Sequence, residues 1–165
     1  MNISPYLKQL GFTKLKEKQK DILRSITSKK DTIGILPTGY GKSVCYILPH
    51  LLYKKNVIVI SPLIALMEDQ YLKLKEKGLN IYTFNSTKDI NIRPISKGEE
   101  IGILYFSPES FMSYSHFIRE LVNKKKVCLF AIDEAHCITS WCDFRDDYNN
   151  LYEIKEICQD KIPIL

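Results

Sequence analysis

Pairs of cysteines at the C-x-x-C spacing are absent from the sequence. That spacing is what structural zinc sites and thioredoxin-like redox sites need. The five cysteines that are present stand apart from one another, and most lie inside apolar runs. Such a pattern is typical of buried free thiols in a reducing compartment. It argues against a zinc site and against a secreted, disulfide-bonded protein.

Long apolar runs are also absent. No stretch reaches the ~20 apolar residues of a transmembrane helix, and the N-terminal sequence MNISPYLKQLGF has no signal-peptide core. We therefore expect a protein of the cytoplasm or the nucleus, not secreted, with no membrane partner. The net charge of +5 allows a polyanionic partner but does not require one, because a surface of solvated lysines gives the same balance.

The composition is that of a globular protein. Its 165 residues are 45% hydrophobic, which is enough for one domain with its own core. The polar stretch 85–100 is interpreted as a connection within that domain. The last residues, KIPIL, have the pattern of a strand that is just beginning, so we expect the sequence to be a piece of a longer protein.

Short apolar runs alternate with helical patterns through most of the chain. The runs are continuous, as in strands buried on both faces, and they cover residues 32–36, 56–61, 80–84, 101–106 and 127–132. Helices are predicted over 16–28, 41–53 and 62–77, over part of 108–125, and near Ser4 and Pro5. This alternation predicts an α/β fold, with a mostly parallel sheet and helices on both faces.

The segments that follow the predicted strands are the most unusual of the chain: PTGYGKS, SPLIALMEDQ, SPES and DEAH. In a parallel sheet, the carboxyl ends of all strands lie at one edge, and ligands bind there. The sequence therefore predicts that these four segments meet at one site.

The stretch LPTGYGKSVCYILP, residues 36–49, is interpreted as a phosphate-binding loop between a strand and a helix. Glycines let the backbone wrap closely, so that N–H groups and the helix dipole hold phosphates. Lys42 is expected to reach the β- and γ-phosphates of a nucleotide, and the Ser43 hydroxyl to bind Mg²⁺. The strict pattern has a glycine where this chain has Leu36, so an ordinary turn with a surface lysine remains an alternative. The predicted nucleotide contacts in this loop are Thr38, Gly39, Tyr40, Gly41, Lys42 and Ser43.

The stretch LFAIDEAH delivers two acidic residues to the same edge of the sheet. Asp133 is predicted to hold Mg²⁺, and Glu134 to act as the general base that polarises the attacking water. An N-cap pair at a helix start is the alternative. No N-K-x-D motif is present to read guanine, so a GTPase is disfavoured.

Taken in order, LPTGYGKSVCYILP, VIVISPLIALMEDQ, ILYFSPES and AIDEAHCITSW resemble the motifs of the RecQ family of superfamily 2 DNA helicases. The likeness covers the first of that family's two RecA-like motor domains. It implies a RecA-like P-loop NTPase fold that uses ATP and Mg²⁺, and a helicase that moves 3′ to 5′ along single-stranded DNA. It also implies a division into N-terminal helices with an adenine-recognition motif, residues 1–30, and an ATP-binding domain, residues 31–165.

The resemblance assigns roles to residues outside the phosphate loop. In GFTKLKEKQ, Gln19 stands where the family reads the adenine edge, Phe12 where an aromatic ring stacks on the base, and Lys16 where an arginine is usual. Lysine lacks the planar stacking of arginine, so nucleotide affinity is expected to be lower. His136 matches the residue that links hydrolysis to DNA binding. By residue type alone, Gln19 reads as an exposed helix glutamine and His136 as a loop histidine.

Two stretches resemble the family's DNA contacts. The predicted nucleic-acid-binding residues are Ser61, Pro62 and Leu63 in SPLIALMEDQ, and Trp141, Phe144 and Arg145 in the aromatic-rich loop SWCDFRDDY. Aromatic rings stack on bases, and arginine reaches phosphates. In that loop Cys142 stands alone where the family has Gly-His, and Asp146 replaces a proline. The coupling between DNA binding and hydrolysis is therefore expected to differ from the family's.

The partners implied by the resemblance are single-stranded or forked DNA and a second RecA-like domain that supplies an arginine finger. The 165-residue chain alone is therefore expected to be nearly inactive. Two alternatives remain open: the motor domain of a superfamily 2 RNA helicase, and a nucleotide-binding interaction module without motor activity.

Overall fold

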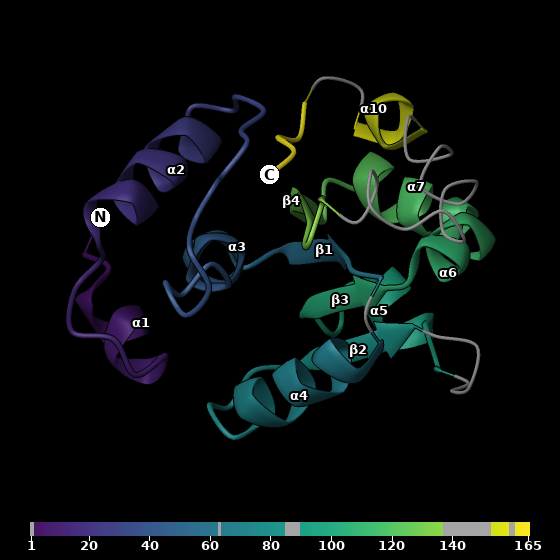
Figure 1. Cartoon of the computed structure of the whole chain (residues 1–165). Coiled ribbons are helices and arrows are strands. Elements are labelled where there is room, and N and C mark those ends of the chain that lie inside the picture. The colour runs from purple at the N-terminus through teal and green to yellow at the C-terminus, as the bar shows by residue number, and fades with distance from the viewer. Residues whose placement is uncertain (1, 63, 85–89, 137–152, 159–160) are drawn as a thin grey trace.

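A parallel four-stranded sheet forms the centre of the protein, seen here in a computed structural model that describes residues 2–62, 64–84, 90–136, 153–158 and 161–165 (Figure 1). Across the sheet the strands follow the order β2 (Ile81–Phe84), β3 (Ile103–Phe106), β1 (Asn56–Ile60) and β4 (Val127–Ile132). Every residue of β1 and β3 is buried. Four of the five predicted strands are thus confirmed. Their continuous apolar runs predicted them because such a run suits a strand with both faces covered.

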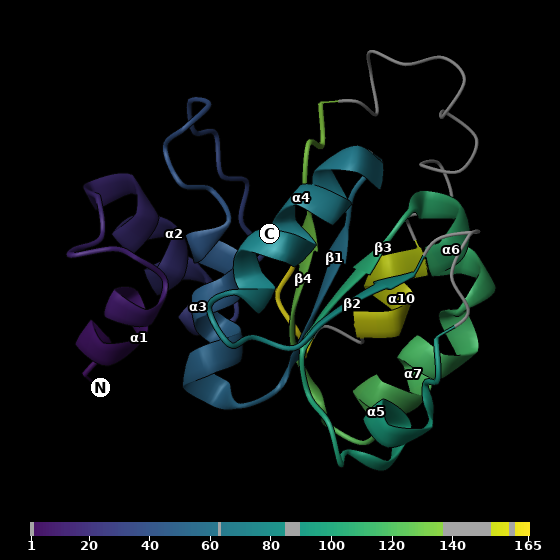
Figure 2. The same ribbon diagram turned by 90° about the horizontal axis from the view of Figure 1, so that it is seen from below.

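Helices cover both faces of this sheet, as predicted (Figures 1 and 2). On one face lie α1 (Ser4–Gln9), α2 (Glu17–Thr27), α3 (Val44–Tyr53) and α4 (Ile64–Lys75). On the other face lie α5 (Arg93–Lys97), α6 (Pro108–Ser113), α7 (Ser115–Asn123) and α10 (Glu153–Cys158). Alternate residues of β1 serve the two cores: Val57 and Val59 face the first, and Ile58 and Ile60 face the second.

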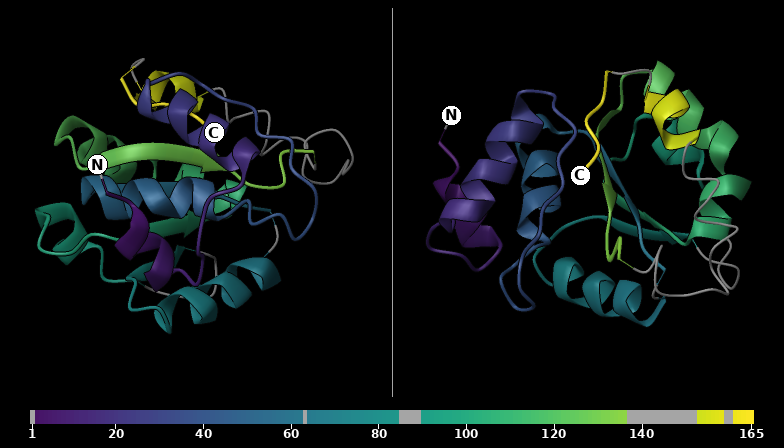
Figure 3. Two further views of the ribbon diagram at one scale, coloured as in Figure 1. Left: turned by 90° about the vertical axis from the view of Figure 1, so that its left-hand side faces the viewer. Right: turned by 45° about the horizontal axis from the view of Figure 1, so that its top comes forward.

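The N-terminal helices α1 and α2 pack against α3 rather than forming a core of their own (Figure 3). Leu7 of α1 and Ile26 of α2 belong to the same buried cluster as Ile47 of α3. This packing places Phe12 and Gln19 beside Gly41 of the loop that precedes α3. The proposed boundary at residue 30 stays a prediction.

Backbone hydrogen bonds join the segments that leave the strands. Asp133 N donates to Ile60 O (2.9 Å), Ser61 N to Phe106 O (3.0 Å), and Ser107 N to Phe84 O (3.4 Å). The carboxyl ends of all four strands therefore lie at one edge, which brings together the starts of SPLIALMEDQ, SPES and DEAH. The fourth predicted segment, PTGYGKS, follows no strand and meets DEAH through the contact between Lys42 and Glu134.

The prediction of a strand over residues 32–36 was wrong. The N–H of Thr32 donates to Ile164 O in the C-terminal segment (2.8 Å), but residues 33–36 form no backbone pairing of a strand with the described residues. Ile33 and Ile35 are 90% and 84% exposed. A strand requires a partner along its length, and the described residues provide one at a single position only.

The C-terminal segment 163–165 lies between β4 and residues 32–36. Ile164 forms an isolated parallel bridge with Phe130, and Leu165 N donates to Phe130 O (2.8 Å). The strand predicted to begin in KIPIL is thus present as a short pairing with β4.

The helices differ most from the predictions in three places. Helix α3 begins at Val44 rather than at residue 41, because the preceding residues form the phosphate loop. The connection 85–100 contains α5, which starts with Pro94 in its first turn and buries Ile95 completely. Helix α10 was not predicted at all. Both missed helices are short, and each is stabilised by burial rather than by a long periodic pattern.

The cysteines follow the prediction where the structure describes them. Cys45 and Cys158 are buried, and Cys128 is half-buried. Within the described ranges, no three histidine, cysteine or acidic side chains gather as a metal site. Cys137 and Cys142 lie outside those ranges. None of the helices that the structure describes has the length and apolar character needed to cross a membrane.

Candidate nucleotide-binding site

The phosphate loop, residues 37–43, enters α3 through two glycines with left-handed backbone. Gly39 has φ +74° and Gly41 has φ +85°. A Cβ on Gly41 would lie 3.0 Å from Nε2 of Gln19 and 3.4 Å from the Phe12 ring, whereas a Cβ on Gly39 would meet nothing within 4 Å. Gly41 is therefore required for both its backbone conformation and its close packing.

Backbone donors gather where this loop meets α3. Among the residues that the structure describes, none accepts a hydrogen bond from the N–H groups of Gly41, Lys42 and Ser43. Ser43 is the N-cap residue of the ten-residue helix α3, and its hydroxyl makes no capping bond. Free N–H groups at a helix N-terminus favour an anion, so the loop has the donors that a phosphate group needs.

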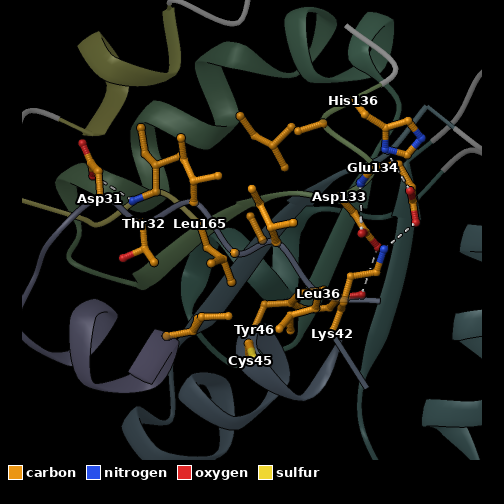
Figure 4. Close-up of a pocket in the computed structure, with 18 residues that line it drawn as sticks. Asp31, Thr32, Leu36, Lys42, Cys45, Tyr46, Asp133, Glu134, His136 and Leu165 are labelled. Carbon is orange, nitrogen blue, oxygen red and sulfur yellow. Dashed lines mark hydrogen bonds and ion pairs between the residues drawn. The ribbon is translucent and has the colours of Figure 1, made fainter. Parts of the chain in front are cut away.

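Lys42, Glu134 and His136 form a charged cluster at the edge of the sheet (Figure 4). Lys42 Nζ lies 3.2 Å from Glu134 Oε1, and His136 Nδ1 lies 3.3 Å from Glu134 Oε2. The Glu134 side chain is 20% exposed, while His136 is 67% exposed. Glu134 has φ +53°, a left-handed conformation that is uncommon for a residue other than glycine. The structure thus unites three predicted site residues from two distant segments.

Asp133 lies at the end of β4, and both of its carboxylate oxygens are held. Oδ1 accepts from Glu134 N (3.0 Å), and Oδ2 accepts from the Tyr46 hydroxyl (3.4 Å). Burial, and then the neighbouring Glu134 carboxylate, raises the pKa of Asp133. A carboxylate has about four lone-pair positions, so these two bonds leave room for water or a metal ion.

The predicted adenine-recognition residues surround the phosphate loop. Gln19 is 1% exposed, so the reading of it as an exposed helix glutamine was wrong. Its Nε2 donates to Tyr40 O (2.9 Å) and Gly41 O (3.1 Å), and its Oε1 accepts from Lys16 N (2.8 Å). Lys16 Nζ lies 4.2 Å from the centroid of the Tyr40 ring. Gln19 therefore ties α2 to the loop, and its role toward adenine stays a prediction.

Two of the predicted nucleic-acid contacts are buried, and the other four lie outside the residues that the structure describes. Ser61 is 1% exposed, its hydroxyl has no hydrogen-bond partner among the described residues, and Pro62 is buried as well. Leu63, Trp141, Phe144 and Arg145 lie outside the described residues. The DNA-binding role of these six residues stays a prediction. Thr38, which was predicted as a nucleotide contact, is exposed in the phosphate loop.

A cavity of about 620 Å³ opens beside the charged cluster (Figure 4). Its walls include the segment 31–36, the start of α3, the end of β4 with its DEAH residues, and the C-terminal segment 163–165. Lys42, Asp133 and Glu134 lie at one end of the cavity, and Asp31 and Thr32 lie at the opposite end (Figure 4). Apolar side chains such as Ile22 and Leu165 also line it. A pocket with an apolar wall and a few convergent polar groups is typical of a small-molecule site.

The sequence of this chain matches a known protein family. A family model described as "DEAD/DEAH box helicase" matches residues 16–164. The chain belongs to the DEAD/DEAH box helicase family.

The relatives of this helicase domain agree with the predicted RecQ resemblance. The chain is 41% identical over 153 residues to the probable ATP-dependent DNA helicase RecS of Bacillus subtilis (strain 168), covering 88% of this chain and 30% of that protein. It is 40% identical over 161 residues to the ATP-dependent DNA helicase RecQ of the same strain, covering 94% and 27%. The chain thus spans less than a third of the length of these two relatives.

A solved structure supports the fold independently. The crystal structure of the DUF1998 helicase MrfA bound to DNA and AMPPNP covers 98% of this chain and 25% of its own, with a TM-score of 0.72 and 23% identity. The predicted RecA-like fold is therefore confirmed.

One site residue of this helicase domain was missed by sequence reasoning. Tyr46 is 3% exposed, and its hydroxyl lies between Asp133 and the hydroxyl of Tyr105. Burial is the main cause that raises the pKa of both phenols, so both keep their protons at neutral pH. No local pattern gave this signal, because Lys42 lies before α3 and the contact of Tyr46 with Asp133 joins residues 87 positions apart.

Proposed function

We propose that this chain is the ATP-binding half of the motor of a RecQ-like, ATP-dependent DNA helicase. The observation that carries the proposal is the contact between Lys42 and Glu134, with Asp133 beside them, at the mouth of a glycine-rich loop. A phosphate-binding lysine and an acidic pair in this arrangement are the parts that phosphoryl transfer from ATP needs. The RecQ-like relatives support DNA as the partner of the whole protein.

The donor set at this site fits a magnesium ion. Asp133 offers carboxylate oxygens with lone pairs to spare, and Ser43 offers a hydroxyl that does not cap its helix. Both are the hard oxygen ligands that Mg²⁺ prefers. When bound, the ion would neutralise charge on the phosphates; Ser43 and Asp133 would hold it.

The remaining steps belong to the chain's own side chains. Lys42 binds the phosphates, and the N–H groups of the loop orient them. Glu134 accepts a proton from the attacking water as general base. His136, which contacts Glu134, is proposed to report DNA binding to that base. Phe12, Lys16 and Gln19 are proposed to hold the adenine base next to the loop.

The whole protein's activity requires parts beyond these residues. We propose that a second RecA-like domain closes the site and supplies an arginine, a contribution of ~10³–10⁵ in rate. Together the two domains would move 3′ to 5′ along single-stranded DNA and unwind forked duplexes. Ser61, Pro62, Leu63, Trp141, Phe144 and Arg145 are the proposed DNA contacts. Such an enzyme would act in the cytoplasm or the nucleus, where DNA and ATP are present together.

Phosphate release tests this proposal directly. The 165-residue chain and the same chain followed by a second RecA-like domain are each assayed with Mg·ATP, with and without single-stranded DNA. We expect negligible release from the short chain and DNA-stimulated release from the longer one. Absence of nucleotide binding by both would favour an unrelated role. Nucleotide binding without stimulated hydrolysis by the longer chain would favour the interaction module.

A second assay separates DNA from RNA and tests the aromatic-rich loop. Trp141→Ala is expected to weaken binding of single-stranded DNA by about 1–3 kcal/mol if a base stacks on the indole. Fluorescence anisotropy with matched DNA and RNA oligonucleotides measures this, beside a thermal melt. Tighter binding of RNA by the parent would favour the RNA helicase. A lower melting temperature with unchanged affinity per folded molecule would assign Trp141 to the core.

A further inference from the structure

Two tyrosines form a hydrogen-bonded pair beneath the acidic end of β4. Tyr46 comes from α3 and Tyr105 from β3, and their side chains are 3% and 1% exposed. The two hydroxyl oxygens lie 3.3 Å apart, and the rings meet edge to face with centroids 6.4 Å apart. The Tyr46 hydroxyl lies 3.4 Å from Asp133 Oδ2. The pair therefore connects the interior of the sheet to a residue of the nucleotide site.

The chemistry of these groups sets the direction of the hydrogen bonds. An ionised carboxylate accepts hydrogen bonds and donates none, so the Tyr46 hydroxyl donates to Asp133. Each phenol has one proton, and Tyr46 has then spent its own. Tyr105 must therefore donate to Tyr46. Each hydroxyl is satisfied in one order only, and that order ends at Asp133 Oδ2.

The two oxygens of Asp133 are held by unlike donors. Oδ1 is bound by the backbone N–H of Glu134, which is part of the turn itself. Oδ2 depends on the Tyr46 side chain. With both oxygens held, the plane of the carboxylate is set, and its remaining lone pairs keep one direction. Removing the Tyr46 hydroxyl would free the carboxylate to rotate about its Cβ–Cγ bond.

Packing alone does not account for these hydroxyls. Phenylalanine rings would fill nearly the same space in the core, and a buried hydroxyl without a partner is costly. The chain instead places two phenols in contact and directs one at an acidic residue of the site. Loss of a group that orients a metal-binding ligand typically costs about 10–100-fold in metal affinity or activity.

We infer that Tyr46 is a positioning residue that orients the Asp133 carboxylate for Mg²⁺, and that Tyr105 acts through Tyr46. The inference rests on the proposed function, since it assigns Asp133 to magnesium. It concerns the hydroxyl groups and not the rings, so Tyr-to-Phe variants test it.

The experiment measures the Mg²⁺ concentration that gives half of the magnesium-dependent gain in binding of a fluorescent ATP analogue. The 165-residue chain is used as parent, with the variants Tyr46→Phe, Tyr105→Phe and the double variant. Binding of the analogue in EDTA and the melting temperature are measured beside it. Tyr82→Phe is the matched control. It also removes a tyrosine hydroxyl, but this hydroxyl lies on β2 and contacts Glu100 instead of Asp133.

We expect Tyr46→Phe to raise the half-saturating Mg²⁺ concentration about 10-fold, the lower end of the effect of lost outer-shell partners. Binding in EDTA should stay within two-fold of the parent. Tyr105→Phe should show a smaller rise, and the double variant should match Tyr46→Phe, because Tyr105 acts through Tyr46. Tyr82→Phe should leave the Mg²⁺ requirement unchanged.

Four outcomes would overturn the inference. A Tyr46→Phe variant with the parent's Mg²⁺ requirement, whatever its melting temperature, would assign the pair to packing. A double variant much worse than Tyr46→Phe would show that Tyr105 acts independently. If Tyr46→Phe does not fold, an unchanged Mg²⁺ requirement in Tyr105→Phe decides against the pair. A parent that binds the analogue equally with and without Mg²⁺ would instead overturn the proposed function, and the inference with it.

Discussion

Lys42 Nζ lies 3.2 Å from Glu134 Oε1, so the predicted phosphate ligand and the predicted general base contact each other. The two side chains are 35% and 20% exposed, and water therefore weakens the attraction between them. A γ-phosphate placed between the loop and Glu134 would compete for the same ammonium group. The contact thus marks where the end of the nucleotide is expected to lie.

Lys42→Ala is expected to weaken binding of Mg·ATP by roughly 1.5–3 kcal/mol or more, because a charge-assisted hydrogen bond to phosphate is lost. Isothermal titration measures the affinity, and circular dichroism checks the fold. Lys20→Ala is the control, because Lys20 lies on the surface of α2 and pairs with Glu17. Equal affinity in Lys42→Ala and the parent would contradict the phosphate-loop assignment.

Glu134→Gln is expected to keep or tighten nucleotide binding, because a neutral amide no longer holds Lys42 as an ion pair. In a protein with both motor domains, hydrolysis should fall about 10²–10⁴-fold, since the amide cannot take a proton from water. Nucleotide affinity and single-turnover phosphate release separate the two effects. Turnover near the parent rate would mean that another group activates the water.

Gly41→Ala is expected to reduce nucleotide affinity and stability together. The new Cβ would meet Nε2 of Gln19 at 3.0 Å, in addition to the cost of about 1–2 kcal/mol for a left-handed residue with a side chain. Gly78→Ala is the matched control, with φ +73° and open space around its Cβ, far from the loop in the sequence. Thermal melts and nucleotide titration compare the two variants. Equal losses of affinity in both would show that the packing against Gln19 is unimportant.

Asp133→Asn is expected to raise the melting temperature at pH 7 in EDTA. Burial and Glu134 raise the pKa of Asp133 above its ordinary value of 3.8, so the folded state takes up the proton more readily than the unfolded state. Ionised Asp133 therefore lowers stability above the raised pKa, and this cost disappears below pH 3.8, where both states are protonated. Each kcal/mol gained should add about 2–4 °C.

Thermal melts of Asp133→Asn and the parent, measured at a series of pH values from 7 downward, test whether ionised Asp133 lowers stability. The gap between them should narrow as the pH falls, while Asp21→Asn, on the exposed face of α2, should show no such trend. A variant that melts below the parent at pH 7 would show that the carboxylate's hydrogen bonds outweigh its burial. The stability gain should be accompanied by loss of Mg²⁺-dependent nucleotide binding.

The sequence by itself determined the features that depend on neighbouring residues. The continuous apolar runs of β1 and β3 indicated strands buried on both faces, because side chains on both faces of such a strand are mostly apolar. The glycine-rich loop before α3 indicated a phosphate site, because left-handed backbone at Gly39 and Gly41 needs glycine. The place of the acidic pair after β4, at the ligand-binding edge of the sheet, followed from the rule that parallel strands end at one edge.

Only the tertiary structure decided which distant groups meet. Residues 32–36 have a strand's composition but form no strand, because pairing depends on a neighbour that the segment itself cannot specify. Gln19 looked like a surface residue, yet packing turned it toward the phosphate loop. Tyr46 lies 87 residues from Asp133 in the chain, and their contact exists because α3 packs on β4. Local propensity and spacing are written in the sequence, whereas such contacts follow from how the sheet and its helices bury their apolar faces together.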